Sequence, residues 1–254
     1  MPLIALFLAV GLFPAAGGAE ACPQMVSAPD ASRRAVALGF LASRAWLELK
    51  LPAARDRDAL KELRRRRRSL DRRTEALQLG TVFSVSEMAL MRRDLGGWEH
   101  EQVTTGSWAM EGAGTLVWVL GTGSPPSWAG PQSIESALRD IMPEGAAETL
   151  VKKPRLRARA EVGRFLEEAR LFQWRIDREE QRRKSGAQPG DKLPDDVTSR
   201  VRAARAGGIT TREAGGDLLS GTTPVGRLDA RALRILGETA RARVEALQWA
   251  CGTH

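Results

Sequence analysis

The chain has 254 residues, of which 43% are hydrophobic, so it can fold around a sizeable core, and global disorder is not expected. Its net charge is +8, and arginine supplies most of the positive side chains. This excess favours an anionic partner such as nucleic acid, a phosphate-rich surface or an acidic protein, although a GC-rich genome also encodes such a composition. Two histidines and two cysteines offer no ligand set for zinc and no histidine-based triad, and we expect neither metal nor cofactor.

The first 21 residues predict a signal peptide. An apolar run from Leu3 to Phe13 is followed by Ala19-Glu20-Ala21, which has the small-x-small pattern of a signal-peptidase site. No lysine or arginine precedes the run, which is shorter than the span of about 20 apolar residues that a bilayer requires. We therefore expect a periplasmic or extracellular protein without a transmembrane helix. The alternative is a translation start at Met25 and a cytoplasmic protein.

The two cysteines lie near the two ends of the sequence. In an oxidising compartment Cys22 and Cys251 can form one disulfide that ties these ends together. Lipidation of Cys22 is the less favoured alternative, because a lipoprotein signal has a leucine three residues earlier, where this chain has Ala19.

Seven segments have the apolar spacing and the capping residues of helices. In chain order they are a helix that starts from an N-cap at Ser32 and stops at Pro52, and helices over 55–79, 84–93, 103–120, 133–142, 157–184 and 229–250. We expect the first of these helices and those that begin near 103, 157 and 229 to form the core.

Between these helices the sequence predicts irregular loops. Segments rich in glycine, proline or threonine fall near 121–131, 185–197 and 206–228. Strand signals are nearly absent, because the chain has no tyrosine and no alternating β-branched runs. The predicted fold is all-α: a single-domain orthogonal helical bundle with irregular loops, spanning 32–252 after a linker over 22–31.

Five consecutive arginines, Arg64 to Arg68, lie within the second helix. Clustered cations neutralise phosphates, which would suit a cytoplasmic nucleic-acid-binding protein. However, five consecutive residues point all round a helix, and no aromatic side chains interleave to stack on bases. We favour a solvated face whose arginines pair with neighbours such as Glu62, Asp71 and Glu75.

One acidic residue stands on an otherwise apolar helical face. In "SWAMEGAGTLVWVLG" the spacing places Glu111 on the same stripe as Trp108 and Trp118. A lone ionised carboxylate there would be costly, so we expect a buried ion pair with an arginine of the final helix, foremost Arg243. The two glycines that closely follow Glu111 would let that helix approach closely.

The tryptophans on apolar helix faces are the other candidate site residues. Tryptophan and arginine dominate protein contact sites, although a place in the core is the favoured interpretation for each indole. No catalytic or metal-binding residue is assigned. The candidate binding set is Glu111, Arg243, Trp108, Trp118, Trp174 and Trp249.

Several short motifs occur in a characteristic order between Ser32 and Trp249. They read "SRRAVAL", "SVSE", "WAME" followed by "VWVLG", then "FQW", and finally "ARVEALQW". In this order they resemble a bacterial family catalogued as domain of unknown function 4272, which implies a helical fold and no assigned activity. The chain departs from the family pattern at Ala109, where an arginine is expected, at Ala242, where a glutamate is expected, and in its signal-like N-terminal segment. These two replacements put in doubt any ligand that the charges hold in relatives.

Three functions are compatible with these features. We favour an exported, noncatalytic binding or interaction module. The first alternative is a hydrolase-type enzyme with Glu111 as its acid/base group. The second is a cytoplasmic nucleic-acid-binding protein that uses Arg64 to Arg68.

Overall fold

The computed structural model describes residues 21–133, 141, 143 and 145–253. Over these residues the chain is predominantly α-helical, which confirms the predicted all-α class. Nearly all of the predicted signal peptide and of the predicted helix over 133–142 lies outside the described residues. No helix in the described part is both long enough and apolar enough to cross a bilayer.

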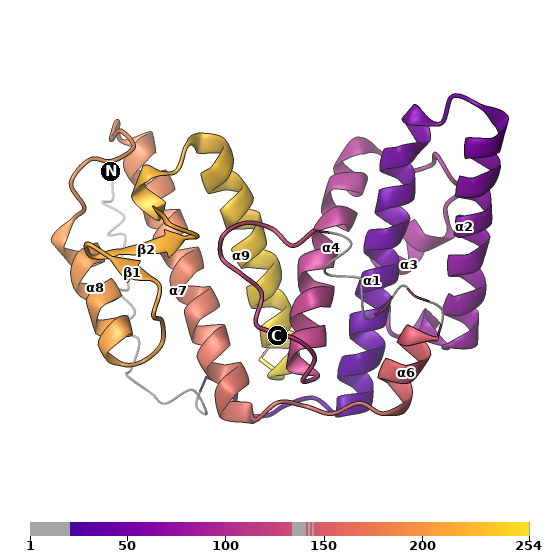
Figure 1. Ribbon diagram of the computed structural model, residues 1–254, viewed down its shortest axis with the longest axis horizontal. Coiled ribbons are helices and arrows are strands. Elements are labelled where there is room, and N and C mark those ends of the chain that lie inside the picture. The colour runs from indigo at the N-terminus through magenta and orange to yellow at the C-terminus, as the bar shows by residue number, and fades with distance from the viewer. Residues whose placement is uncertain (1–20, 134–140, 142, 144, 254) are drawn as a thin grey trace, which may run out of the picture.

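Four long helices form the core, as predicted. They are α1 (Ala28–Lys50), α4 (His100–Val119), α9 (Ala230–Ala250) and α7 (Arg159–Lys184), and Figure 1 shows them side by side in that order. α4 packs against both α1 and α9, and α9 also packs against α7. This order makes α4 and α9 the two central helices of the molecule.

Glycines let α4 lie close to its neighbours, because they carry no side chain. A Cβ atom on Gly106 would lie 2.6 Å from the Trp98 ring, and one on Gly112 would lie 3.1 Å from Cδ1 of Leu38 in α1. Glycine destabilises a helix interior by up to about 1 kcal/mol relative to alanine. At these positions the tight contact with α1 compensates for that penalty.

The start of α1 differs from the prediction. Ser27, and not Ser32, is the N-cap: its hydroxyl accepts a hydrogen bond from the Asp30 amide at 3.2 Å. Pro29 occupies the first turn, where a missing amide hydrogen costs nothing. Ser32 is buried inside the helix, and the predicted linker therefore ends at Ser27.

Two further helices pack outside α1. α2 (Arg57–Ala76) buries only two leucines, and α3 (Val85–Arg92) begins with a capping box formed by Ser84 and Glu87. Short 3₁₀ turns, Leu51–Ala53 and Leu79–Thr81, flank α2. α2 is thus a peripheral helix, as its sparse apolar positions predict.

The opposite end of the molecule contains structure that the sequence does not predict. α8 (Asp195–Ala206) begins inside the predicted loop over 185–197, and three short antiparallel strands occupy the predicted irregular segment. The strands and the turn that follows them are β1 (Glu213–Ala214), β2 (Asp217–Ser220), β3 (Thr223–Pro224) and the 3₁₀ turn Val225–Arg227. The short helix α6 (Ala146–Lys152) lies at the other end of the molecule, against α1 (Figure 1). The strands are too short for a period-two pattern to be visible.

A disulfide between Cys22 and Cys251 joins the segment before α1 to the end of α9. The amide of Val26 donates to the carbonyl of Ala250 at 2.9 Å, and Arg159 donates to the carbonyl of Pro23 at 3.0 Å. The segment before α1 is therefore fastened to both α9 and α7. The disulfide also resolves the alternatives for Cys22, because a thiol engaged in a disulfide cannot carry a lipid.

Candidate functional site

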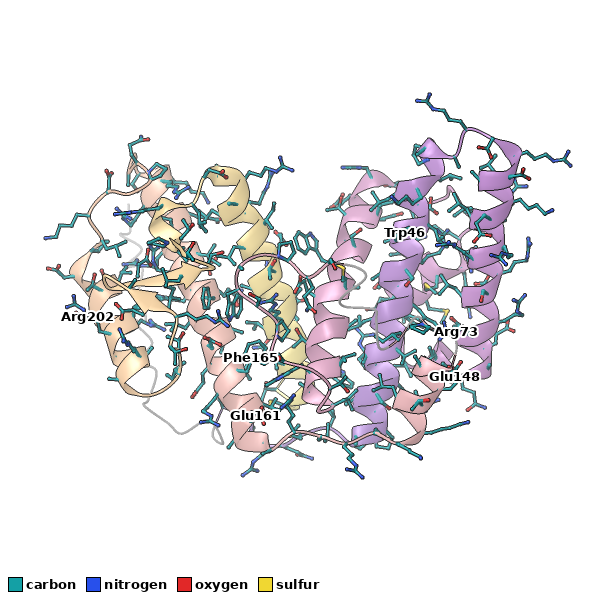
Figure 2. The ribbon with its side chains drawn as sticks, in the orientation of Figure 1. Trp46, Arg73, Glu148, Glu161, Phe165 and Arg202 are labelled. Atoms are coloured by element: carbon teal, nitrogen blue, oxygen red, sulfur yellow. A yellow bond between two sulfur atoms is a disulfide. The ribbon has the colours of Figure 1, made fainter. Side chains whose placement is uncertain are left out.

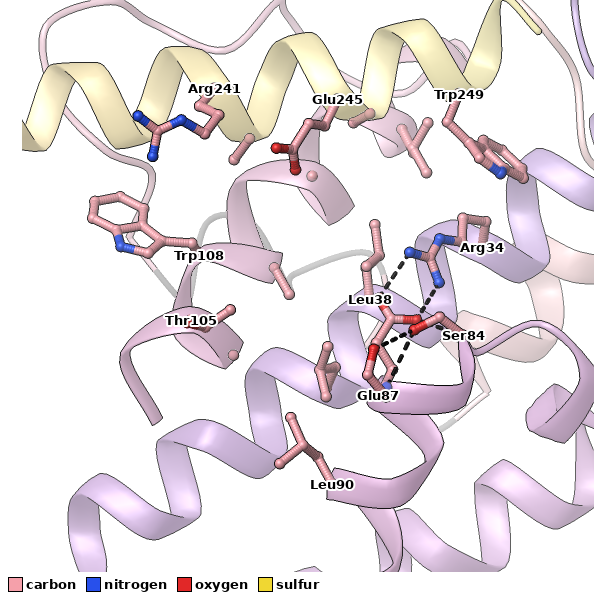
Figure 3. A pocket seen from close by; sticks show the side chains of 18 of the residues that line it. Arg34, Leu38, Ser84, Glu87, Leu90, Thr105, Trp108, Arg241, Glu245 and Trp249 are labelled. Carbon is pink, nitrogen blue, oxygen red and sulfur yellow. Dashed lines mark hydrogen bonds and ion pairs between the residues drawn. The ribbon is translucent and has the colours of Figure 1, made fainter. Parts of the chain in front are cut away.

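A groove of about 670 Å³ lies between α1, α3, α4 and α9 (Figure 3). Gly106, Ala109 and Gly112 of α4 line it at three-residue spacing, so they form one smooth helical face. Leucines from α1, α3 and α4 add to the apolar lining: Leu38, Leu41, Leu90 and Leu116. The groove is thus a shallow apolar channel with small side chains at its floor.

Two of the four candidate tryptophans belong to this groove. Trp108 reaches it from α4 and Trp249 from the end of α9, and both are half-buried (Figure 3). The other two lie elsewhere. Trp118 is buried against Phe165, with ring centroids 4.7 Å apart, and the guanidinium of Arg200 lies 4.0 Å from the centroid of Trp174.

Charged side chains line the two long edges of the groove. On one edge Arg34 binds Glu87 through two hydrogen bonds of 2.6 and 2.8 Å. On the other edge Arg241 pairs with Glu238 at 2.9 Å. Glu245 also lines this edge and forms no ion pair within the described chain. It is the one groove carboxylate whose charge is left for a ligand.

Glu111 lies on the side of α4 turned away from the groove, and it is fully buried. Arg243 donates from Nε to Oε2 of Glu111 at 3.0 Å, which confirms the predicted ion pair. The amide of Gln132 donates to the other carboxylate oxygen. Both carboxylate oxygens thus accept hydrogen bonds, and this arrangement favours a structural role over an acid/base role.

A tryptophan that is not among the candidate site residues, Trp128, packs against the Glu111–Arg243 pair. Trp128 is fully buried, stacks on Phe172 with centroids 4.1 Å apart, and lies 4.6 Å from the guanidinium of Arg243. Arg243 also donates to the carbonyl of Ser127 at 3.0 Å. The loop over 121–131 is therefore pinned to the core. Burial lowers the pKa of Arg243, while the charge of Glu111 acts in the opposite direction.

A second carboxylate lies close to this centre. Burial raises the pKa of Glu168 above its ordinary value of 4.5, while a hydrogen bond from Thr210 and the charges of Arg212 and Arg243 act in the opposite direction. The Thr210 hydroxyl donates to Glu168 at 2.8 Å. Glu168 does not line the groove. Sequence reasoning missed it because it is one of many acids along a charged helix.

The arginine run is solvated at four of its five positions. Arg65 and Arg66 both bind Glu62 and lower the pKa of that carboxyl to about 2. Arg67 is the exception to the predicted solvated face, because its side chain is only 13% exposed and pairs with Asp71. Arg67 also donates to the carbonyl of Met91 at 2.5 Å and so joins α2 to the end of α3. Glu75 forms no ion pair with the run in the described structure.

The two departures from the family pattern meet in the groove. Ala109 of α4 and Ala242 of α9 both line it, although 133 positions separate them in the chain (242 − 109). An arginine and a glutamate at these places would occupy the channel that the two alanines leave open.

No family model, no curated protein and no solved structure matches this chain. The resemblance to domain of unknown function 4272 therefore stays a prediction.

Proposed function

We propose that this protein is an exported, noncatalytic binding module whose groove accepts an amphipathic helix of a partner protein. The observation that carries the proposal is the shape of the groove. Four helices turn a face toward one channel, and the small side chains of Ala109 and Ala242 leave it open to a further helix. Laying the apolar face of a helix into a groove between helices is a recurrent mode of peptide recognition.

The distribution of apolar surface supports a protein partner. Val85 is 91% exposed, and it stands between the groove-lining residues Ser84 and Ser86. Half-buried tryptophans at the groove add two anchors of a kind that often dominates binding energy. A helix in the groove would cover Trp108 and Trp249.

The charge of the groove indicates which helix it accepts. Its charged side chains are three glutamates and two arginines, a local charge of −1, whereas the whole chain carries +8. Four of these five side chains pair with one another, and Glu245 is left over. We therefore expect the partner helix to place a lysine or arginine opposite Glu245, where like-charged partners would be rejected.

Titration with labelled synthetic helices tests the proposal. One peptide carries leucines at i, i+3, i+4 and i+7 with a lysine beside this stripe, and a second carries glutamate in place of the lysine. Fluorescence anisotropy should show saturable binding that favours the lysine peptide. Ala109→Trp should weaken binding at least about tenfold by filling the channel, a change of about 1.4 kcal/mol.

Charge reversal gives the matched control. Glu245→Lys should abolish the preference for the lysine peptide, whereas Glu75→Lys, on the exposed face of α2, should leave it intact. Equal binding by wild type and Ala109→Trp would place the peptide elsewhere and refute the groove as the binding site.

Export is the second part of the proposal. The Cys22–Cys251 disulfide supports it, because such bonds persist in oxidising compartments and are rare in the cytosol. N-terminal sequencing of the protein from its native cell should give a start at or next to Cys22. A start at Met1 or Met25 would contradict export.

A further inference from the structure

A second cleft, of about 490 Å³, lies on the far side of α7, where α8 meets the short strands. Three separate elements supply cations to it: Lys192 comes from the loop before α8, Arg202 from α8 and Arg227 from the 3₁₀ turn after β3. Figure 2 places Arg202 on α8, at the end of the molecule opposite α2. Nothing in the proposed helix-binding function uses this cleft.

The cations of the cleft differ from most arginines of this protein. Along the described chain the majority of the arginines bind a carboxylate or a backbone carbonyl, yet none of these three side chains has an ion pair or a hydrogen bond there. The nearest comparison is Arg205, one turn along α8, whose guanidinium binds Glu213 at 2.5 Å. Arg202 interacts with Glu213 through the attraction of their charges and not through a hydrogen bond. Three positive side chains therefore line the cleft without an ion pair of their own, together with Asp191, Asp195 and Asp217.

A buried ion pair holds the walls of the cleft in place. Arg175 is fully buried and binds Asp217 through two hydrogen bonds of 2.6 and 3.1 Å. Asp217 in turn accepts from the Gly226 amide at 2.8 Å, and the Gly226 carbonyl accepts from the Gly190 amide at 2.8 Å. This chain of bonds connects α7, β2, the 3₁₀ turn and the loop. The backbones that carry the three cations are thus fixed relative to one another.

Close packing leaves little freedom for these walls to shift. A Cβ atom on Gly226 would lie 2.9 Å from the Arg175 guanidinium, so only glycine fits beside the buried pair. The carbonyl of Lys192 accepts from Arg182 at 3.1 Å, which fixes the loop a second time. A preformed site loses less entropy on binding than a mobile one.

Acidic groups at the cleft limit the charge that it can accept. Asp217 is neutralised by Arg175, and Asp191 accepts a hydrogen bond from the Gln188 amide at 2.7 Å. Asp195 stands in the first turn of α8, where the helix dipole favours an acid. These carboxylates would repel a long polyanion, whereas a single tetrahedral anion can sit among the three cations.

We infer that this cleft binds one phosphate group, either as free phosphate or as the phosphate of a small monoester. Arginine guanidinium groups bind phosphate through paired hydrogen bonds, and lysine adds a point charge. The cleft volume leaves room for a small substituent beside the phosphate.

Isothermal titration calorimetry on the full chain tests this inference. Sodium phosphate and glycerol 3-phosphate are titrated separately, with chloride holding the ionic strength constant. At least one of them should bind saturably at one site. Arg202→Gln and Arg227→Gln should each weaken that binding at least about tenfold, equivalent to about 1.4 kcal/mol. Both residues are exposed, so thermal melts should show folded variants, and Lys192→Gln provides a third variant with the same expectation.

Arg234→Gln is the matched control, because Arg234 is exposed on α9, forms no ion pair in the described chain and does not line the cleft. It removes the same charge and should leave affinity within about twofold. Binding of phosphate alone would identify free phosphate as the ligand, and tighter binding of glycerol 3-phosphate would identify a monoester. Absence of saturable binding of both, or equal weakening by Arg234→Gln, would overturn the inference. None of these outcomes depends on the helix-binding groove.

Discussion

The buried pair of Glu111 and Arg243 is the most informative contact at the scale of single residues. Each charge has lost its water, and each regains hydrogen bonds from the other and from the loop that covers them. The loop takes part because Trp128 covers the guanidinium while Ser127 accepts from it. The pair therefore joins α4, α9 and the loop over 121–131 at one point.

Glu111→Gln tests the structural role of this pair. The substitution leaves the Arg243 charge buried without a counter-ion, and breaking one partner of a buried pair typically costs about 3–5 kcal/mol. Chemical denaturation should show a loss of that size relative to wild type. Glu75→Gln, on the exposed face of α2, should stay within about 0.5 kcal/mol. A Glu111→Gln protein as stable as wild type would instead point to an acid/base or ligand role.

The raised pKa of Glu168 predicts that the stability of the protein depends on pH. Burial raises its pKa above 4.5 in the folded protein, so the folded state holds this proton more tightly than the unfolded state does. The contribution of Glu168 to stability is therefore fully present below its unfolded pKa and is lost as pH rises through the raised folded value. Glu168→Gln keeps the neutral form at every pH.

Denaturation curves measured between pH 4 and 8 provide the readout. Relative to wild type, Glu168→Gln should gain stability as pH rises through this window, and the two proteins should converge at the acidic end. Glu161→Gln, a more exposed change on α7, should follow the wild-type profile. A Glu168→Gln profile parallel to wild type would show that this carboxyl does not couple folding to pH.

At the scale of elements, the sequence predicts those helices that have a regular apolar spacing and a recognisable capping residue. The helices predicted over 84–93 and 229–250 start at the right places, where Ser84 and Asp229 cap α3 and α9 and a side-chain oxygen of each satisfies a free amide. The true cap of α1 is missed, because Ser32 also fits a cap and Pro29 reads as a helix breaker. α8 is missed because only three of its residues are buried.

The candidate site is predicted in part for similar reasons. The Glu111–Arg243 pair can be inferred from one helical stripe, because a buried acid requires a cation. The contact of Trp128 with this pair cannot be inferred in the same way, because a loop has no periodic pattern. The groove depends on the long-range approach of α4, α9 and α1, which no local pattern contains.

Arg67 provides a prediction about how α2 is held. Its side chain is largely buried and donates to the carbonyl of Met91, while its neighbour Arg68 is exposed. Arg67→Ala should cost about 1.5–3 kcal/mol, the usual contribution of a hydrogen bond to a charged group. Arg68→Ala should change stability by no more than about 0.5 kcal/mol. Equal effects of the two substitutions in urea denaturation would mean that the run is uniformly solvated.

At the scale of the whole molecule, the two proposed binding sites are separated by α7 and α9. Figure 1 shows α1 on one side of α9 and α8 on the far side of α7. The groove is lined from α1, α3, α4 and α9, and the phosphate cleft from α8, the strands and the loops beside them. Their side chains also differ, since the groove has one unpaired glutamate, whereas the cleft has three unpaired cations beside Asp191 and Asp195. A partner helix with a lysine and a phosphate group can therefore each find a complementary site without competing.

The disulfide closes the chain into a loop that contains nearly the whole fold. Cys22 and Cys251 are 229 positions apart, and cross-linking so long a loop restricts the unfolded chain strongly. The chain-entropy relation gives a stabilisation of about 5 kcal/mol for a loop of this length, and measured values are commonly about 2–4 kcal/mol. The bond also lies two residues beyond Trp249, so it anchors one end of the groove.

Replacing both cysteines by serine should therefore lower both stability and helix binding. We expect the double variant to lose about 2–5 kcal/mol in urea denaturation and to bind the lysine peptide more weakly, because the end of α9 that carries Trp249 is released to fray. Phosphate binding should stay within about twofold of wild type, since the cleft is fastened by Arg175 and Asp217 instead. A reducing agent should reproduce the effects in wild type and change nothing further in the double variant. If reduction leaves wild-type stability unchanged, the bond does not restrain the chain; if it weakens both ligands equally, the two sites are not independently held.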